Sequence, residues 1–243
     1  EPGLAVRFTA RLAAKVAVTV DDSRRYFSAR KVVVTGYPVR SELQGLSREE
    51  ARDALGLKRT APALLVMGGS RGARSINRAL SGILEEVLSM AQVVHLTGRL
   101  DWPWVSERRG ALPQGLRDRY RAFPYLHRRM GRALAAADLA VCRSGASTLG
   151  ELPLFGLPAV LVPYPHAWRY QRVNAEWLTK RGAAVALRDE RLERELLPTL
   201  RRLLTDEERL GEMGDQALAL SRPNAAATLA GHFMGLAEAG GHQ

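Results

Sequence analysis

Two short turns rich in glycine and serine could bind a phosphate group. Residues 68–74 (GGSRGAR) and 143–151 (RSGASTLGE) each follow a strongly apolar run and lead into a segment of helical periodicity. In such a turn, glycines let the backbone approach a ligand, and the unpaired N–H groups at the helix start attract an anion. Ser70 could add a hydroxyl donor, and Arg71 a positive charge. The first turn is neither a Walker A sequence nor a GxGxxG fingerprint, so a tight turn whose glycines serve only packing stays an alternative.

The second turn carries a carboxylate near the start of the next helix. Ser147 or Thr148 can cap that helix, and Glu151 falls in its first turn. A carboxylate at this point can accept hydrogen bonds from the paired hydroxyls of a ribose. Alternatively it only complements the helix dipole, which is worth about 0.3–1 kcal/mol. Two such turns in one sheet predict a nucleotide at the carboxyl ends of the strands.

A third segment, residues 163–174, leaves an apolar run and enters a helix. Gln171 and Asn174 are three residues apart, so they share a helix face near its start. Two neighbouring amides can donate to and accept from vicinal hydroxyls, which suits a sugar ring. The alternative is an ordinary solvated helix face.

The elements that position these residues alternate between strand and helix. Continuous apolar runs bounded by glycine or proline are typical of strands buried on both faces, and their alternation with helices predicts an α/β fold with a doubly wound parallel sheet. The predicted strands are 32–34, 63–67, 92–96, 138–142, 158–162 and 183–187, and the predicted helices are 75–90, 147–155 and 169–181. Ser47, with Glu50 three residues later, indicates another helix start. The tail over 192–239 predicts two or three helices.

Composition and charge narrow the class of protein. The 243 residues allow one large domain or two small ones, and no apolar run is long enough to cross a bilayer. The 36 basic and 25 acidic residues give a net charge of +11, which favours anionic partners, although a solvated arginine-rich surface accounts for most of it. Aromatic residues are only 6% and do not cluster with the basic ones, so we expect no nucleic acid partner.

The sequence contains no spacing typical of a metal site, and we expect neither a metal nor a cofactor. Cys142 is the single cysteine, so no internal disulfide can form, and a reducing cytosol fits best. At the end of a predicted strand, Cys142 is expected to be a buried small hydrophobe rather than a nucleophile.

Taken together, these segments resemble the MurG family of bacterial N-acetylglucosaminyltransferases. The resemblance covers nearly the whole chain and fades in the last helices. It is carried by VVVTGYPVR (32–40), LLVMGGSRGARSIN (64–77), VVHLTG (93–98), AADLAVCRSGASTLGEL (136–152) and GLPAVLVPYPHAWRYQRVNAEWLTKRGAA (156–184). It implies one half of a GT-B glycosyltransferase, a fold of two Rossmann-like halves that face each other over a cleft. The donor sits mostly in the C-terminal half, which is the half that this chain resembles.

The resemblance also implies roles for individual residues. Arg40 matches an arginine near the donor's phosphates or sugar, Ser70 the serine that binds the diphosphate, and Glu151 the acid on the ribose hydroxyls. The uracil pocket is expected around Leu126. The complete set of implied substrate-binding residues is Arg40, Ser70, Arg71, Leu126, Ala146, Ser147, Thr148, Leu149, Gly150, Glu151, Gln171 and Asn174.

The family's reaction transfers N-acetylglucosamine from UDP-GlcNAc to an undecaprenyl-linked muramyl-pentapeptide, with inversion and without a metal. The resemblance therefore implies these two substrates, an anionic membrane surface as partner, and a peripheral location on the cytoplasmic face of the bacterial plasma membrane. Residues 1–40 are expected to be a remnant of the N-terminal acceptor domain with its linker, and 41–243 the donor-binding domain with a helical tail. About a hundred residues are missing relative to a typical two-domain length, and we expect the general base among them.

Three positions depart from the family's pattern. Tyr37 stands where the family usually has Asn, and Arg71 and Leu96 stand where it usually has Gln. Arg71 could strengthen diphosphate binding. Two other functions stay open at this point: another UDP-sugar GT-B transferase that acts on a glycolipid, and a donor-binding subunit that needs a separate acceptor chain.

Overall fold

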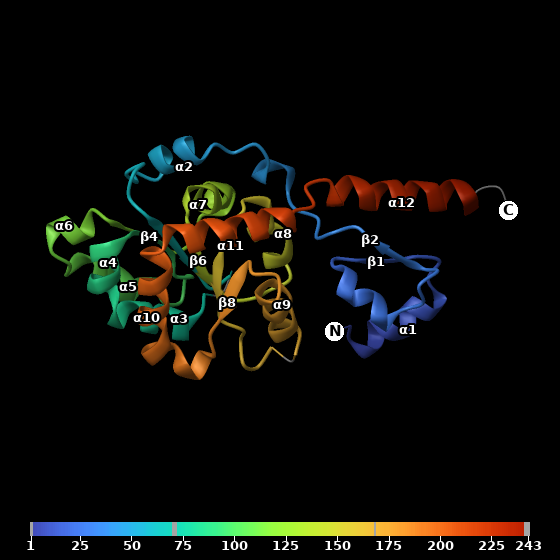
Figure 1. Cartoon of the computed structure of the whole chain (residues 1–243), viewed down its shortest axis with the longest axis horizontal. Coiled ribbons are helices and arrows are strands. Elements are labelled where there is room, and N and C mark those ends of the chain that lie inside the picture. The colour runs from blue at the N-terminus through green and yellow to red at the C-terminus, as the bar shows by residue number, and fades with distance from the viewer. Residues whose placement is uncertain (1, 70–71, 168, 241–243) are drawn as a thin grey trace.

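The computed structural model describes residues 2–69, 72–167 and 169–240. Its main body is a six-stranded, entirely parallel sheet in the order β5-β4-β3-β6-β7-β8, and a separate pair, β1-β2, lies near the N-terminus (Figure 1). The strands are β1 (Val16–Val18), β2 (Val32–Val34), β3 (Ala63–Met67), β4 (Gln92–Leu96), β5 (Tyr120–Phe123), β6 (Leu139–Cys142), β7 (Ala159–Leu161) and β8 (Ala184–Ala186).

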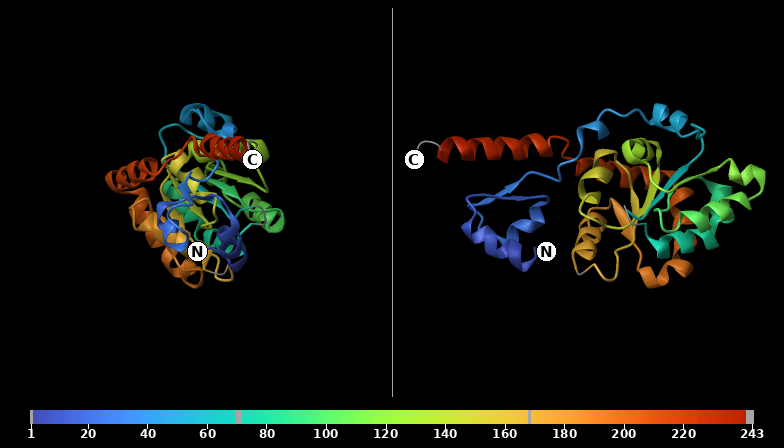
Figure 2. Two further views of the ribbon diagram at one scale, coloured as in Figure 1. Left: turned by 90° about the vertical axis from the view of Figure 1, so that its right-hand side faces the viewer. Right: turned by 180° about the vertical axis from the view of Figure 1, so that it is seen from behind.

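Helices connect the strands and cover both faces of the large sheet (Figures 1 and 2). They are α1 (Leu4–Leu12), α2 (Arg48–Ala54), α3 (Arg74–Gly82), α4 (Leu84–Met90), α5 (Trp102–Gly110), α6 (Gln114–Arg117), α7 (Met130–Ala136), α8 (Thr148–Leu154), α9 (Tyr170–Thr179), α10 (Leu192–Leu204), α11 (Glu207–Ala219) and α12 (Ala225–Gly240).

Alternate residues of each central strand enter two different hydrophobic cores. On β3, Ala63, Leu65 and Met67 pack with residues of α2, α7, α8 and α9, whereas Leu64 and Val66 pack with residues of α3, α4, α5 and α10. Side chains of a strand alternate between the two faces of its sheet, so a strand covered on both faces must be apolar throughout. This explains the continuous apolar runs of the sequence and confirms the predicted α/β fold with a doubly wound parallel sheet.

The structure corrects the predicted helix over 75–90. The first helix ends at Gly82, and a new helix begins at Leu84, because Ile83 has a non-helical backbone conformation with φ of −123° and ψ of 15°. Two strands, β1 and β5, were not predicted. In β5 only alternate residues are buried, so it lacks the continuous apolar run of the central strands.

Other local predictions are confirmed. Ser47 is the N-cap of α2, where its Oγ accepts a hydrogen bond of 3.4 Å from the backbone N–H of Glu50. The tail forms the three helices α10, α11 and α12. Cys142 is 1% exposed, and burial, together with the nearby Glu151 carboxylate, raises the pKa of its thiol to about 12. The thiol is therefore a buried hydrophobe and not a nucleophile at neutral pH.

The two ends of the chain lie on the same side of the main body (Figures 1 and 2). α12 projects away from the large sheet on the side where α1, β1 and β2 lie. The segment just before α12 is bound by Gln44, whose Nε2 donates to the Pro223 carbonyl at 2.8 Å. None of the helices within the described ranges is both long and apolar enough to cross a membrane. The predicted division of the chain at residue 40 stays a prediction.

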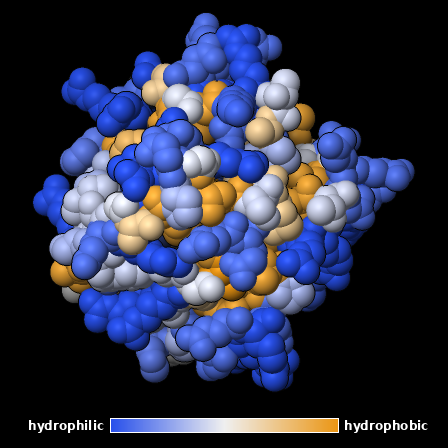
Figure 3. Space-filling model, turned by 90° about the vertical axis from the view of Figure 1, so that its left-hand side faces the viewer, coloured by the Kyte–Doolittle hydropathy of each residue, from blue (hydrophilic) through white to orange (hydrophobic). Residues whose placement is uncertain are grey.

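The surface is mainly hydrophilic. At the end of the molecule that carries α4, α5 and α6, hydrophilic residues dominate the face, and the largest group of apolar residues lies in its middle (Figure 3). Among the described arginines, Arg52 alone is fully buried, at 2% exposure, and most of the others are exposed to solvent.

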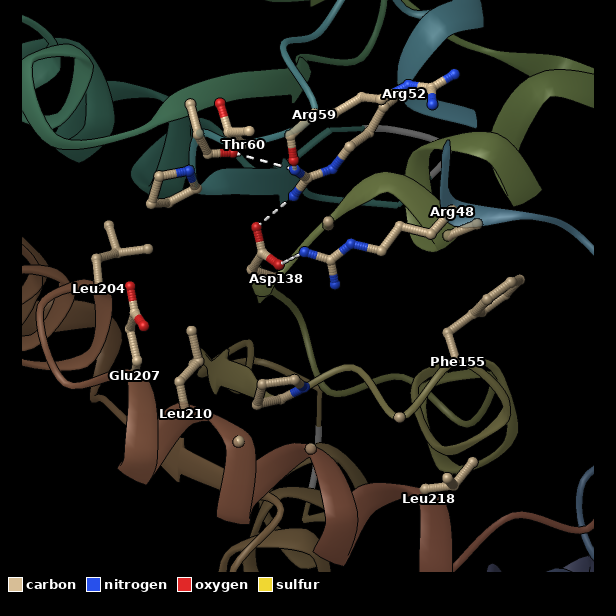
Figure 4. Close-up of a pocket in the computed structure, with 18 of the residues that line it drawn as sticks. Arg48, Arg52, Arg59, Thr60, Asp138, Phe155, Leu204, Glu207, Leu210 and Leu218 are labelled. Carbon is tan, nitrogen blue, oxygen red and sulfur yellow. Dashed lines mark hydrogen bonds and ion pairs between the residues drawn. The ribbon is translucent and has the colours of Figure 1, made fainter. Parts of the chain in front are cut away.

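A hollow of about 620 Å³ lies at the amino ends of the strands, between α2, α8 and α11 (Figure 4). Arg52 and Asp138 form its floor with an ion pair of 2.6 Å. Arg52 also donates to the Ala136 carbonyl at 3.0 Å, and Asp138 accepts from the Ala63 N–H at 2.8 Å. This pair therefore ties α2 to the first residue of β3 and to the segment before β6.

Replacing Asp138 by asparagine is expected to lower the free energy of unfolding by about 3 kcal/mol, because it leaves the buried Arg52 guanidinium without its counter-charge. Urea denaturation measures this change. Asp53→Asn is the matched control, since Asp53 pairs with Arg59 in solvent and its loss is expected to change stability little. Equal effects of the two substitutions would contradict the role given to the Arg52–Asp138 pair.

Candidate functional site

The candidate site lies where β3 and β6 end side by side. From β3 the sheet continues through β4 to β5, and from β6 it continues the other way, through β7 to β8. In a doubly wound sheet this change of direction opens a crevice at the carboxyl ends of the two strands. The turns at 68–73 and 143–147 both begin at this point.

The turn after β3 closes so tightly that only glycine fits at two positions. A Cβ on Gly68 would lie 2.1 Å from the Ala73 nitrogen, and one on Gly72 would lie 2.4 Å from the Thr97 carbonyl oxygen. Gly72 also has a φ of +79°, which favours glycine. Ser70 and Arg71 lie outside the described residues, so their roles stay predictions.

The start of α3 is linked to the end of β6 by a polar cluster that we did not predict. The Arg143 guanidinium donates to Asp189 at 2.5 Å and to the Ser75 hydroxyl at 2.8 Å, and Ser75 in turn donates to Asp189 at 2.7 Å. The Arg143 side chain is only 12% exposed. Its charge is therefore balanced internally, and it holds the two turns at a fixed separation.

The turn after β6 leaves backbone donors free. Thr148 is 4% exposed and its hydroxyl donates to the Gly145 carbonyl at 2.6 Å, so its side chain shapes the turn. The N–H groups of Ala146 and Ser147 have no hydrogen-bond acceptor among the residues that the structure describes. These N–H groups can therefore donate to a ligand.

The N–H groups of the next two residues are used within the turn. Leu149 donates to the Ala146 carbonyl at 3.2 Å, and Gly150 donates to the Ser147 carbonyl at 3.0 Å. Gly150 also allows close packing, because a Cβ at this position would lie 2.9 Å from the Tyr37 Cβ.

The linker before α2 reaches the same turn through this close contact. A Cβ on Gly150 would also lie 3.0 Å from Val39 Cγ1, so residues 37–39 pack directly on the start of α8. The contact brings the exposed Arg40 into electrostatic range of Glu151. The structure therefore brings these two predicted residues together from positions far apart in the sequence.

Glu151 is a partly buried carboxylate. Burial raises its pKa, while a hydrogen bond from Ser147 and the charge of Arg40 act in the opposite direction. A carboxylate held in this way is a strong hydrogen-bond acceptor, which is the property needed to bind two hydroxyl groups.

Gln171 and Asn174 join the site through the backbone of the second turn. The Asn174 Nδ2 donates to the Ser144 carbonyl at 3.1 Å, and the Ser144 hydroxyl donates to the Gln171 carbonyl at 2.8 Å. The Gln171 Oε1 accepts from the Tyr164 N–H at 2.9 Å. These bonds leave the Gln171 Nε2 as a donor and the Asn174 Oδ1 as an acceptor.

Leu126 differs from the other predicted residues. Its side chain is 3% exposed and packs in the hydrophobic core, and its carbonyl accepts from the Arg129 N–H at 2.8 Å. The next residue, His127, has a φ of +43°, an unusual conformation for a residue other than glycine. Any contact of Leu126 with a ligand is therefore through its backbone.

The arrangement combines free N–H groups, a carboxylate and two amides at one edge of the sheet, which suits a phosphorylated nucleotide that carries a sugar. The profile of the glycosyltransferase family 28 C-terminal domain matches residues 63–229. The chain belongs to glycosyltransferase family 28. Its sheet and both turns lie within the matched family 28 region.

Relatives in this family are similar over nearly the whole chain. A protein of Roseiflexus sp. is 44% identical over 94% of the chain, and one of Chlorobaculum tepidum is 40% identical over 98%. Both are named UDP-N-acetylglucosamine–N-acetylmuramyl-(pentapeptide) pyrophosphoryl-undecaprenol N-acetylglucosamine transferase. The chain spans 60% and 64% of their lengths. The resemblance to the MurG family is confirmed.

Solved structures agree. MurG of Acinetobacter baumannii matches with a TM-score of 0.73 at 26% identity, over 94% of this chain and 62% of that one. UDP-GlcNAc 2-epimerase of Neisseria meningitidis, solved with UDP-GlcNAc, matches with a TM-score of 0.66 over 94% of this chain and 63% of that one. At 13% identity this second likeness concerns the fold alone. The family 28 domain thus has the predicted Rossmann-like fold of a GT-B half.

Replacing Glu151 by glutamine is expected to raise the melting temperature at pH 8. The raised pKa means that the folded chain favours the neutral carboxyl group, so the charged form costs stability once the pH exceeds the ordinary carboxyl value of about 4.3. Glutamine removes this cost. The gain should therefore disappear as the pH falls to 4.

Thermal unfolding of both proteins between pH 4 and pH 8 measures this difference. Glu42→Gln, at an exposed position, is the control and should change little at either pH. A lower melting temperature for Glu151→Gln at pH 8 would show that the carboxylate is needed for folding rather than for a ligand.

Proposed function

We propose that this chain is the donor-binding half of an N-acetylglucosaminyltransferase of peptidoglycan synthesis. In this proposal the enzyme transfers N-acetylglucosamine from UDP-GlcNAc to undecaprenyl-linked muramyl-pentapeptide. The observation that carries it is the meeting of two tight turns, Glu151 and Gln171 at one edge of a family 28 domain. The identity of 44% to a relative named for this reaction supports it.

The diphosphate of the donor would lie over the turn after β3 and the start of α3. Ser70 and Arg71 would bind it there, and the N–H groups of Ala146 and Ser147 would contribute from the second turn. When the bond from the anomeric carbon to UDP breaks, its electron pair leaves with the β-phosphate. Fixed N–H donors and arginines stabilise that negative charge without a metal.

The nucleoside would lie along the second turn. Glu151 would accept hydrogen bonds from the ribose hydroxyls, with Arg40 beside it near the phosphates or the sugar, and the backbone at Leu126 would meet the uracil. Thr148, Leu149 and Gly150 would act by shaping the turn, because their polar groups are already bonded within it or packed against the linker.

The N-acetylglucosamine would meet the two amides with complementary chemistry. The Gln171 Nε2 would donate to one sugar hydroxyl, and the Asn174 Oδ1 would accept from another, since their other amide atoms are bonded to protein. This pairing discriminates between sugars by the direction of their hydroxyl groups.

Inverting transfer also needs a base that removes the proton of the acceptor hydroxyl as it attacks the anomeric carbon. We assign no base to this chain and place it, with the acceptor site, in the other half of the enzyme. The net charge of +11 and the exposed apolar residues of α1, such as Leu4 and Phe8, support a peripheral place on an anionic membrane, at its cytoplasmic face.

Calorimetric titration with UDP-GlcNAc, UDP-glucose and UDP tests the proposal. The chain is expected to bind UDP-GlcNAc more tightly than UDP-glucose. Gln171→Ala is expected to weaken UDP-GlcNAc binding by about 1–3 kcal/mol through the lost hydrogen bond, with the affinity for UDP unchanged.

Gln114→Ala is the control, because Gln114 lies on α6, away from both turns, and should alter no affinity. Equal binding of the two sugar nucleotides would favour a transferase for another sugar. No binding of UDP or of either sugar nucleotide would contradict the proposal.

A further inference from the structure

A chain of hydrogen-bonded side chains runs through the core beneath the turn after β3. It consists of Tyr120, His95, Asn77 and Asp101, and each is at most 3% exposed. His95 Nδ1 lies 2.6 Å from the Tyr120 hydroxyl, and its Nε2 lies 3.0 Å from Asn77 Oδ1. None of these four side chains is among the residues assigned above to the nucleotide site.

The direction of each hydrogen bond follows from Asn77. Its Nδ2 donates to the Thr97 carbonyl and to Asp101 Oδ2, both at 2.8 Å. Its Oδ1 can therefore only accept, and the proton of His95 must be on Nε2. The His95 Nδ1 then accepts from the Tyr120 hydroxyl.

Electrostatics keep this arrangement fixed over the physiological pH range. Burial lowers the pKa of His95 to about 3 against the opposing charge of Asp101, so the imidazole stays neutral. Although burial acts to raise the pKa of Asp101, hydrogen bonds from Asn77, Trp104 and Arg74 lower it. Each of the four side chains is thus hydrogen-bonded, and Asp101 is the one that carries a charge. A buried network whose members are all bonded holds its side chains rigidly.

The network contacts the turn and the start of α3 at two points, the Thr97 carbonyl and the Asp101 carboxylate. The Thr97 carbonyl that Asn77 holds is the one against which Gly72 packs. The Asp101 carboxylate that Asn77 also holds accepts from Arg74 Nε at 3.1 Å, at the first residue of α3. Asn77 therefore fixes the position of two groups: the Thr97 carbonyl, on which Gly72 packs, and the Asp101 carboxylate, which binds Arg74.

We propose that Asn77 is a positioning residue for the diphosphate of the nucleotide, acting through Thr97 on Gly72 and through Asp101 on Arg74. This inference rests on the proposed function, which assigns the diphosphate to this turn. The network stabilises the fold, but apolar side chains of similar shape can replace a buried hydrogen-bonded pair at little cost, so its contacts with the turn are a second reason for its presence.

The strand β4, which carries His95 near its carboxyl end, offers a matched control at its amino end. Gln92 is a second buried amide, 2% exposed, which accepts from the Lys58 N–H at 2.7 Å and donates to the Lys58 carbonyl at 3.0 Å. It lies at the amino end of β4, whereas Asn77 meets the carboxyl end. Both amides stabilise the fold, but only Asn77 lies beneath the turn.

The test compares Asn77→Leu with Gln92→Met by NMR titration with UDP and with uridine. The ratio of the two dissociation constants reports the contribution of the diphosphate. Asn77→Leu is expected to reduce the affinity for UDP about ten-fold and that for uridine less than about two-fold. Gln92→Met is expected to leave the ratio unchanged, even where it lowers the melting temperature by as much.

Tyr120→Phe serves as a milder variant should Asn77→Leu not fold, since it keeps the ring and removes only the hydroxyl that fixes His95. It is expected to lower the UDP affinity about two-fold to three-fold, again without an effect on uridine. An unchanged ratio in the folded variants, or an equal change in Gln92→Met, would overturn the inference. Failure of the parent chain to bind UDP would instead contradict the proposed function.

Discussion

No side chain fits at Gly68 or at Gly72, because the turn between β3 and α3 folds back on itself and onto the Thr97 carbonyl. This steric constraint fixes where α3 starts and in which direction its first N–H groups point. The parallel sheet brings the end of β6 beside that start, and the cluster of Arg143, Ser75 and Asp189 holds the two together. The shape of the candidate site is therefore set by the packing of the protein itself, without a ligand.

The two edges of the sheet carry different kinds of polar residues. At the amino edge, the polar groups of Arg52 and Asp138 are bonded to one another and to the backbone, and they join α2 to the strands. At the carboxyl edge, Glu151 keeps a carboxylate whose burial costs stability, and Gln171 and Asn174 each keep a free amide atom. Free hydrogen-bonding groups therefore lie at the carboxyl edge, where a doubly wound α/β domain is expected to bind its ligand.

The sequence predicted the parts of the fold that depend on local pattern. β3 and β4 have the predicted bounds, since both are continuous apolar runs buried on both faces. β5 could not be predicted in the same way, because its alternate residues are only partly buried. The break at Ile83 was missed, because the apolar pattern continues through it from α3 into α4.

The site shows the same division. Glu151, Gln171 and Asn174 could be placed by their spacing from a turn or from one another. The contacts of Arg143 with Asp189 and of Asn77 with Asp101 join residues 46 and 24 positions apart, and nothing local in the sequence pairs them. Arg40 reaches Glu151 only because the linker packs on Gly150, which is a tertiary contact. The roles of Ser70, Arg71 and Leu126 toward a ligand stay predictions.

Amide hydrogen exchange with and without UDP-GlcNAc tests whether the donor binds at the carboxyl edge, where β3 and β6 end. We expect slower exchange on binding in two stretches, the start of α3 and residues 144–151. Residues 48–62, beside the hollow at the amino edge, should exchange at unchanged rates. Protection confined to that hollow, with none at the two turns, would contradict it.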